Sequence, residues 1–275
     1  MQSLRTLLQE GKAQLAQIEN GVQDAWLLME DVFEISRHEY FLKEEEIVPE
    51  EKEEAYLKLI RERKKHIPLQ QLTQKAYFYG LCFYVNDQVL IPRQDTECLV
   101  EEVLKHMGRE GKLLDMCTGS GCILLTLLHE RPGYEGTGAD ISPSALKVAR
   151  TNMELLGIKA RLTESNLFDC IDGVYDIIVS NPPYIASDEI PRLMEEVRDH
   201  EPHLALDGKE DGLYFYREIV KQAGSYLKAG GWLCFEIGYD QGEAVKGLLE
   251  DAGYEQTAVR KDLAGLDRVV IGRKI

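Results

Sequence analysis

Apolar residues recur at helical spacing over the first part of the chain. Leu4, Leu7 and Leu8 lie close to the period of about 3.6 residues that marks one face of a helix, and the pattern returns over residues 25–35. No stretch here alternates apolar and polar residues as a half-buried strand does. The pattern predicts a small helical bundle over residues 1–75.

Aromatic and β-branched residues fill the next segment, residues 76–93. Tyr77 and its aromatic neighbours form short runs that are interrupted by Gly80 and by Asn86-Asp87. Such runs, separated by turn-forming residues, are typical of a β-hairpin. We expect this hairpin to link the helical bundle to the rest of the chain.

Short apolar runs alternate with helical stretches over residues 94–275. Asp95 or Thr96 is suited to cap a helix that continues to about Met107. This alternation is typical of a mostly parallel sheet that is covered by helices, so we expect an α/β domain. The expected strands are Lys112–Cys117, Gly136–Ile141, Ala160–Asn166, Tyr175–Ser180, Gly231–Ile237, Gln256–Lys261 and Arg268–Gly272.

Composition narrows the class of protein. A chain of 275 residues is long enough for one sizeable core and a smaller companion domain. Its apolar fraction of 44% and charged fraction of 29% are ordinary for a soluble protein, and no window is apolar enough for a membrane helix. The N-terminus lacks the features of a secretory signal, so we expect a soluble, cytoplasmic protein that does not bind membranes.

Charge and cysteine usage exclude further classes. The formal net charge of −16 would repel a phosphate backbone, so we expect a protein or small-molecule substrate and no stable nucleic-acid binding. The six cysteines are scattered without a C-x-x-C pair, which predicts reduced thiols and no metal site. We expect the protein to be a monomer.

A glycine turn follows the first expected strand of the α/β domain. The strand that contains Leu113 and Leu114 runs into Thr118-Gly119-Ser120-Gly121 and then into a helix. Such a turn lets the backbone approach a ligand closely at the carboxyl end of a strand. Nicotinamide-binding folds use a related turn, so this motif alone leaves the cofactor open.

Polar residues at the ends of the neighbouring strands extend this site. Asp140, followed by Ile141, lies where a carboxylate accepts both ribose hydroxyls of a nucleoside cofactor. The Asp115 carboxylate would attract the cationic amino-acid part of S-adenosylmethionine, whereas it would repel the pyrophosphate of a dinucleotide. Asn166 and Leu167 are placed to flank the adenine. These residues favour S-adenosylmethionine as the cofactor, and the alternative is that the two carboxylates cap the following helices.

A buried strand ends in Asn181-Pro182-Pro183-Tyr184. An amide nitrogen is a poor nucleophile because its lone pair is delocalised, and no ordinary base removes its proton near neutral pH. The Asn181 side-chain oxygen and the Pro182 carbonyl would each accept one hydrogen of an NH₂ group and aim its nitrogen at a methyl carbon. Tyr184 would stack on the planar group. The motif predicts methylation of a planar NH₂ group. The alternative is that these four residues form only a rigid turn, because Asn and Pro are common turn residues.

Taken together, these motifs resemble the release factor glutamine methyltransferases, class I S-adenosylmethionine enzymes that modify the Gly-Gly-Gln loop of release factors. The resemblance covers nearly the whole chain. It implies a Rossmann-like seven-stranded catalytic domain over residues 94–275, a helical substrate-docking domain, and class I peptide chain release factors as the protein substrate. The other segments that carry it are Val89–Arg93 with Thr96-Glu97, Glu201-Pro202 with Ala205-Leu206, Asp211–Leu213 with Tyr216-Arg217, Glu236–Gly238 with Gln241-Gly242, and Asp262–Gly265 with Arg268–Val270.

The resemblance also implies roles for single residues, with Arg93 and Glu97 at the rim of the pocket that admits the glutamine. The expected donor-binding residues are Asp115, Thr118, Gly119, Ser120, Gly121, Asp140, Ile141, Asn166, Leu167 and Asn181. The expected substrate-binding residues are Arg93, Glu97, Asn181, Pro182, Pro183 and Tyr184, of which Asn181, Pro182 and Tyr184 are the expected catalytic ones.

Two positions depart from the family pattern. Cys117 stands where the family usually has the first glycine of its turn, and Gln94-Asp95 replaces the usual Pro-Glu after Arg93. Because cysteine is small, we expect these departures to alter the detail of the site while binding of S-adenosylmethionine is retained. Three other functions stay open at this point: methylation of the adenine amine in DNA or RNA, which uses the same tetrapeptide, nicotinamide-dependent oxidoreduction, and a non-catalytic binding module.

Overall fold

The computed structural model describes residues 2–275, and these form two units. The first unit runs to Lys75 and also includes Met194–His200. The second unit consists of Ala76–Leu193 and Glu201–Ile275. The sequence pattern assigned all of residues 94–275 to the catalytic domain, whereas the structure groups a short segment of it with the helical unit.

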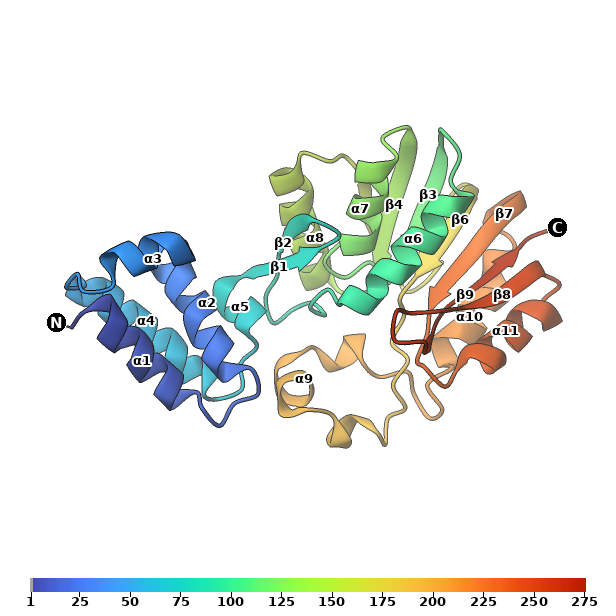
Figure 1. Ribbon diagram of the computed structural model, residues 1–275. Coiled ribbons are helices and arrows are strands. Elements are labelled where there is room, and N and C mark those ends of the chain that lie inside the picture. The colour runs from blue at the N-terminus through green and yellow to red at the C-terminus, as the bar shows by residue number, and fades with distance from the viewer. Residues whose placement is uncertain (1) are drawn as a thin grey trace. The chain divides into compact units, whose positions relative to one another are not determined.

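The first unit contains the helical bundle that was predicted over residues 1–75, whose helices α1 to α4 are drawn in shades of blue in Figure 1, together with the later helix α9. Its buried core includes Leu7, Leu28 and Ile60, one from each of the three longest helices, and all three are fully buried. The later segment is held to this unit because Glu196 pairs with the buried Arg63. The helices are α1 (Leu4–Gln14), α2 (Gly21–Phe33), α3 (Arg37–Lys43), α4 (Glu50–Arg63), α5 (Leu69–Thr73) and α9 (Glu195–His200).

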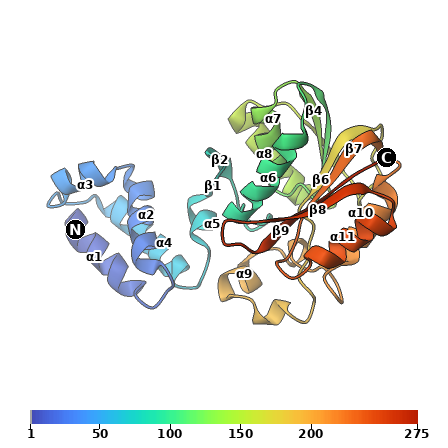
Figure 2. The same ribbon diagram turned by 45° about the vertical axis from the view of Figure 1, so that its right-hand side comes forward.

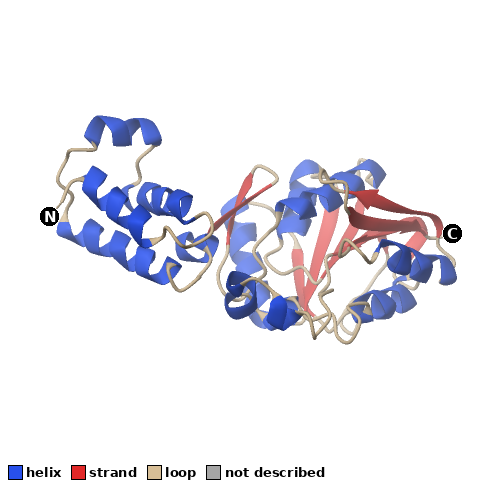
Figure 3. Cartoon of the chain, turned by 60° about the horizontal axis from the view of Figure 1, so that its bottom comes forward, coloured by secondary structure: helices blue, strands red, loops and turns tan. Residues whose placement is uncertain are grey.

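The hairpin consists of β1 (Lys75–Phe78) and β2 (Leu81–Tyr84), and Figure 3 shows it apart from the larger sheet. Its two turn residues, Tyr79 and Gly80, both have positive φ, 50° and 76°. Positive φ at both positions is the type I′ geometry, whose twist matches that of the strands. The strands thus occupy only the first half of the predicted 76–93 segment, and the chain beyond Tyr84 continues without regular structure to Arg93.

The second unit is built on a seven-stranded sheet of order β5-β4-β3-β6-β7-β9-β8. All neighbouring pairs are parallel except the two that involve β9, so the prediction of a mostly parallel sheet is confirmed. The chain order reverses beside β3, which is where ligands bind in open α/β sheets. The strands are β3 (Gly111–Met116), β4 (Tyr134–Asp140), β5 (Arg161–Glu164), β6 (Tyr175–Ser180), β7 (Leu227–Glu236), β8 (Glu255–Lys261) and β9 (Asp267–Arg273).

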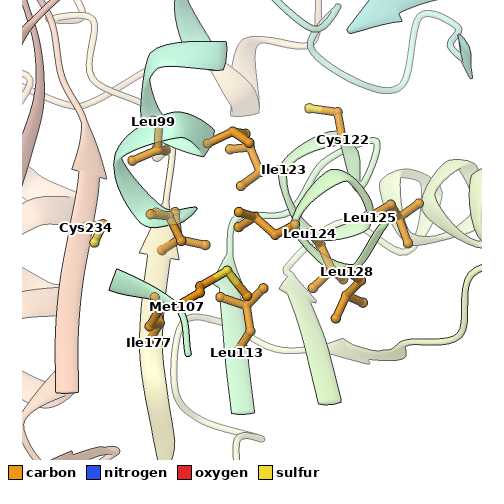
Figure 4. Close-up of a cluster of buried hydrophobic side chains, with 14 of the residues drawn as sticks. Leu99, Met107, Leu113, Cys122, Ile123, Leu124, Leu125, Leu128, Ile177 and Cys234 are labelled. Atoms are coloured by element: carbon orange, nitrogen blue, oxygen red, sulfur yellow. The ribbon is translucent and has the colours of Figure 1, made fainter. Parts of the chain in front are cut away.

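Helices cover both faces of this sheet (Figure 2). Side chains alternate between the faces along each strand, so Leu113 and Ile177 join one core while Leu114 and Ile178 join the other. Figure 4 shows the first core, in which side chains of two helices meet those of the central strands. The first core packs under α6 (Glu97–His106) and α7 (Cys122–Glu130), beside α8 (Pro143–Leu156), and the second under α10 (Tyr214–Ala223) and α11 (Gly242–Asp251).

The helix that was expected to start at Asp95 or Thr96 begins differently. A 3₁₀ turn, η1 (Gln94–Thr96), leads directly into α6, and Thr96 occupies the N-cap position without making a capping hydrogen bond. By contrast, the Ser142 hydroxyl accepts a hydrogen bond from the backbone nitrogen of Ala145 at 3.2 Å and caps α8. Two further 3₁₀ turns are η2 (Ile190–Arg192) and η3 (His203–Ala205). No helix within residues 2–275 is long and apolar enough to span a membrane.

Gly136 on β4 allows α7 to pack closely on the sheet. A Cβ atom at this position would lie 2.7 Å from Leu128 Cδ1 and 2.8 Å from Leu124 Cδ1. We expect Gly136→Ala to lower the free energy of unfolding by about 1–3 kcal/mol, because the packed leucines must shift. Gly247→Ala in α11 is the matched control, since its added Cβ would meet no atom of the described residues within 4 Å and alanine favours a helix. Urea unfolding that showed equal stabilities for the two variants would contradict this account of the packing.

Candidate active site

A cavity of about 340 Å³ lies where β3, β4 and β6 end. Its walls come from the glycine turn, the ends of three strands, the chain after the hairpin, and the segments around residues 202–215. The volume falls at the low end of the range of about 300–1,000 Å³ that is usual for small-molecule sites. Of the predicted site residues, the cavity is lined by Arg93, Thr118, Gly119, Ser120, Asp140, Ile141, Asn166, Leu167, Asn181 and Pro183.

Five of the predicted residues do not line this cavity: Glu97, Asp115, Gly121, Pro182 and Tyr184. Other residues line it although the sequence analysis gave them no role, among them Ser142 and the aromatic pair Tyr214-Phe215. A signal for that pair was present, because it adjoins the Tyr216-Arg217 segment that carries the family resemblance. Helix α10 begins at Tyr214, which places these rings at the same edge of the sheet as the glycine turn.

The glycine turn is fixed by hydrogen bonds to the neighbouring strand. The backbone nitrogen of Thr118 donates to the Ala139 carbonyl at 3.0 Å, and that of Gly119 donates to Asp140 Oδ2 at 2.9 Å. Gly119 and Gly121 both have positive φ, 55° and 80°, which favours glycine. The turn therefore presents bare backbone to the cavity in one defined conformation.

Asp140 is held in a fixed orientation at the end of β4. Its Oδ1 accepts from the backbone nitrogen of Ser142 at 2.9 Å, while Oδ2 accepts from Gly119. Burial raises the pKa of this carboxyl, and these backbone hydrogen bonds oppose the shift. Each carboxylate oxygen has a second lone pair, so the group can still accept hydrogen bonds from a pair of ligand hydroxyls.

Asp115 lies fully buried beneath the turn. Thr118 Oγ1 donates to its Oδ2 at 2.6 Å, whereas Oδ1 has no partner among the described residues. Burial raises the pKa of Asp115 to about 7. A buried carboxyl with an unused acceptor fits a cationic ligand above the turn. The N-cap residues of the two following helices are Gly121 and Ser142, and the backbone N–H of Leu124 in the first turn of α7 opposes the rise in the pKa of Asp115.

The tetrapeptide Asn181–Tyr184 directly follows β6. The Ser180 hydroxyl donates to the Met116 carbonyl at 2.6 Å and ties the strand end to β3. Asn181 lines the cavity, and its carboxamide has no hydrogen-bond partner in the part of the chain that the structure describes. Its oxygen is thus available to an incoming NH₂ group on the wall of the cavity.

Tyr184 adjoins a buried acidic group at the end of β7. Glu236 is 2% exposed, and its Oε2 lacks a partner within residues 2–275. Burial raises the pKa of Glu236 to about 7, an effect opposed by a hydrogen bond from Thr96, by the nearby Arg268 and by a hydrogen bond from Tyr184. Burial also raises the pKa of Tyr184. The Thr96 hydroxyl therefore forms its hydrogen bond with Glu236, which explains why this hydroxyl does not cap α6.

Arg93 and Glu97 occupy different environments although both were expected at the pocket rim. Arg93 lines the cavity and pairs with Glu201, whose side chain is only 1% exposed. Glu97 instead accepts a hydrogen bond from the backbone nitrogen of Tyr79 at 2.8 Å, which holds the hairpin turn to α6. Among residues 2–275, no group of three or more His, Cys, Asp or Glu side chains is placed to bind a metal ion.

Cys117 adopts a left-handed conformation in the glycine turn, with φ of 62°. This conformation strains any residue that has a Cβ atom. Cys117→Gly and Cys117→Ala both remove the thiol, but only glycine removes the strain. We expect the glycine variant to be more stable than the alanine variant by about 0.5–1 kcal/mol in urea unfolding, after allowance for the extra chain entropy of glycine. An alanine variant at least as stable as the glycine variant would show that the turn is not strained at this position.

Glu236 makes the stability of the fold depend on pH. Its pKa of about 7 is higher than that of a glutamate in an unfolded chain, so the stability it contributes at low pH is lost as the pH rises through about 7. Glu236→Gln cannot ionise and has nearly the same shape. As the pH rises from about 5 to about 8, we expect the free energy of unfolding of Glu236→Gln to increase by about 1–2 kcal/mol relative to that of the unmodified protein. Urea unfolding at both pH values measures this, and a difference that did not change with pH would refute the shift.

Two family models match the chain. Residues 6–73 match the PrmC N-terminal domain, and residues 93–209 match the methyltransferase small domain. A methyltransferase structure from Pyrococcus furiosus superimposes with a TM-score of 0.54 over 71% of this chain and 90% of that chain. Its sequence identity is 16%, so this likeness bears on the fold alone. It supports the class I methyltransferase architecture that the sheet order indicates.

Curated relatives extend over most of the chain. A release factor glutamine methyltransferase from Clostridium acetobutylicum is 41% identical over 256 residues, which cover 90% of this chain and 87% of the relative. Another of the same name, from Fusobacterium nucleatum, is 41% identical over 263 residues, with 94% of this chain and 74% of the relative covered. Identity at this level over this length requires a shared family. The chain belongs to the release factor glutamine methyltransferase family.

Proposed function

We propose that this protein transfers a methyl group from S-adenosylmethionine to the side-chain amide nitrogen of the glutamine in the Gly-Gly-Gln motif of class I peptide chain release factors. The observation that carries this proposal is the unpaired Asn181 carboxamide on the wall of a cavity that the glycine turn and Asp140 also line. Donor-binding and amide-binding groups thus lie around one space. The activity modulates translation termination.

The donor side of the site consists of groups that suit a nucleoside with a cationic tail. We assign the ribose hydroxyls to Asp140, the adenine to the neighbourhood of Asn166 and Leu167, and the cationic tail to the field of the buried Asp115. S-adenosylmethionine supplies an already electrophilic methyl group, so the protein needs to orient and enclose the reactants rather than activate them.

The acceptor side must position an amide that no side chain deprotonates. Asn181 Oδ1 and the Pro182 carbonyl each accept one amide hydrogen and direct the nitrogen lone pair toward the methyl carbon. Transfer forms the N–C bond and breaks the S–C bond, so S-adenosylhomocysteine leaves as the neutral thioether and one amide proton passes to solvent water. We assign Pro183 and Arg93, which line the cavity, to the walls around the glutamine. We assign Tyr184, which follows directly behind this lining, to the planar face of the amide, and the helical unit to docking of the release factor.

Several consequences of this assignment follow from the substrate. Release factors act on ribosomes, so the proposed activity places the protein in the cytoplasm. A monomer contains all the residues assigned to the reaction. The net charge of −16 disfavours tight binding to DNA or RNA, which separates the proposal from methylation of an adenine amine.

The direct test is mass spectrometry of a recombinant bacterial release factor after incubation with the purified protein and S-adenosylmethionine. We expect one added methyl group, located by fragmentation on the glutamine of the Gly-Gly-Gln motif. An unmodified release factor together with methylated adenine in a parallel incubation with DNA or tRNA would overturn the proposal.

Asn181→Ala tests the assignment of the amide-binding group. The variant loses one of the two acceptors that orient the amide, so we expect turnover on the release factor to fall by about 10²-fold or more. The dissociation constant of S-adenosylmethionine, measured by calorimetry, should change much less than turnover, because the other expected donor-binding residues remain in place. Asn181→Asp retains an acceptor oxygen and serves as the matched control, with an expected turnover between those of the alanine variant and the unmodified protein. Equal turnover of the alanine variant and the unmodified protein would remove Asn181 from the mechanism.

A further inference from the structure

The last residue of the catalytic tetrapeptide is held by a glutamine from a distant part of the chain. Gln241 Nε2 donates a hydrogen bond to the carbonyl oxygen of Tyr184 at 2.9 Å. Gln241 stands at the N-cap position of α11 but makes no capping hydrogen bond there. The side chain of Gln241 therefore does not cap α11 but forms a hydrogen bond with the loop that follows β6.

The carboxamide of Gln241 is engaged at both ends. Its Oε1 accepts from the backbone nitrogen of Gly238 at 3.0 Å and lies 3.4 Å from the Tyr216 hydroxyl. The backbone N–H of Gly238 can only donate, so it selects the orientation in which oxygen faces β7 and the NH₂ group faces Tyr184. The same NH₂ group lies 3.5 Å from the Gly212 carbonyl. One planar amide thus joins three segments with a single allowed orientation.

Glycines at two positions let these segments come together. A Cβ atom at Gly212 would lie 2.3 Å from the Tyr184 carbonyl oxygen and 2.7 Å from Gln241 Nε2. A Cβ atom at Gly208 would lie 2.7 Å from Tyr184 Cα. Real Cβ atoms do not approach backbone this closely, so any side chain here would push Tyr184 away from Gln241. The next residue, Ile185, is also held here, since its N–H donates to the Leu206 carbonyl at 3.0 Å and its carbonyl accepts from the backbone nitrogen of Gly208 at 2.8 Å. Gln241 therefore adds a side-chain hydrogen bond to a closely packed backbone.

The tetrapeptide between the two fixed points is stiff. Ser180 is tied to β3 at one end, and the Tyr184 carbonyl is held by Gln241 at the other. Proline fixes φ near −65°, so the Pro182-Pro183 pair leaves little freedom between these ends. Holding the Tyr184 carbonyl therefore also determines where the Pro182 carbonyl points.

We propose that Gln241 is a positioning residue for methyl transfer, because it fixes the tetrapeptide in the geometry in which Asn181 and Pro182 receive the substrate amide. The inference rests on the proposed function. Gln241 touches neither the cavity nor the expected donor residues, so its loss should affect the chemical step more than donor binding.

The test is Gln241→Met, which keeps the length of the side chain and removes both hydrogen-bonding groups. We expect kcat on the release factor to fall by about 10–100-fold, since a displacement of about 1 Å costs a factor of this size. The KM for the release factor and the calorimetric Kd for S-adenosylmethionine should change by less than about threefold. Gln222→Met is the matched control, because among residues 2–275 the Gln222 side-chain amide bonds only within α10, to the Glu218 carbonyl at 3.2 Å. The kcat of this control variant should equal that of the unmodified protein.

A second variant keeps the inference testable if the methionine variant unfolds. Gln241→Glu has the same size and retains the acceptor for Gly238, but it places an oxygen against the Tyr184 carbonyl. We expect the loss of kcat to be at least as large as that of Gln241→Met, and the melting temperature to stay within a few degrees of that of the unmodified protein. A normal kcat in either folded variant would overturn the inference and leave the proposed function intact. Failure of the unmodified protein to methylate the release factor would instead refute the proposed function itself.

Discussion

The parallel pairing of β3 with β4 and β6 is the constraint on which the site depends. Asp115 on β3 pairs with Gly138 on one side and Val179 on the other, so the three strands end at the same edge. Each of these strands runs directly into a functional segment. Because successive parallel strands share a direction, their carboxyl ends deliver these segments to one place without any long loop. Shifting this register would separate the glycine turn and Asp140 from Asn181, which now line one cavity.

Rigidity in this site comes from connections beyond the motifs themselves. The glycine turn is oriented by Asp140 from the next strand, and Asp140 is itself oriented by the backbone of Ser142. In the same way the tetrapeptide is held at its end by Gln241. The proposed methyl transfer relies on orientation rather than on acid or base catalysis, so it would gain from such fixed backbone, since little reorganisation is left for the transition state.

The sequence predicted the elements well and their interactions less well. β6 was predicted to the residue, because an apolar run bounded by Tyr175 and the Asn-Pro turn leaves no other choice. β5 was predicted over seven residues but spans only Arg161–Glu164, since only these pair with β4. The place of Glu97, which binds the hairpin rather than the cavity, depends on a tertiary hydrogen bond that no local pattern signals. The short charged segment Met194–His200 likewise carried no sign that it belongs with the helical unit.

The segments that carried only a family resemblance acquire physical roles once the fold is known. Asp211–Leu213 supplies the glycine against which Tyr184 packs, and Glu236–Gly238 supplies both a buried carboxyl beside Tyr184 and the N–H that orients Gln241. Arg268 interacts with that same carboxyl and pairs with Asp262 at 3.1 Å. These segments are far apart in the sequence and share no chemistry that a motif search would connect. What these three segments share is proximity to one residue, Tyr184, so this part of the family pattern reflects the contacts that hold the end of the tetrapeptide in place.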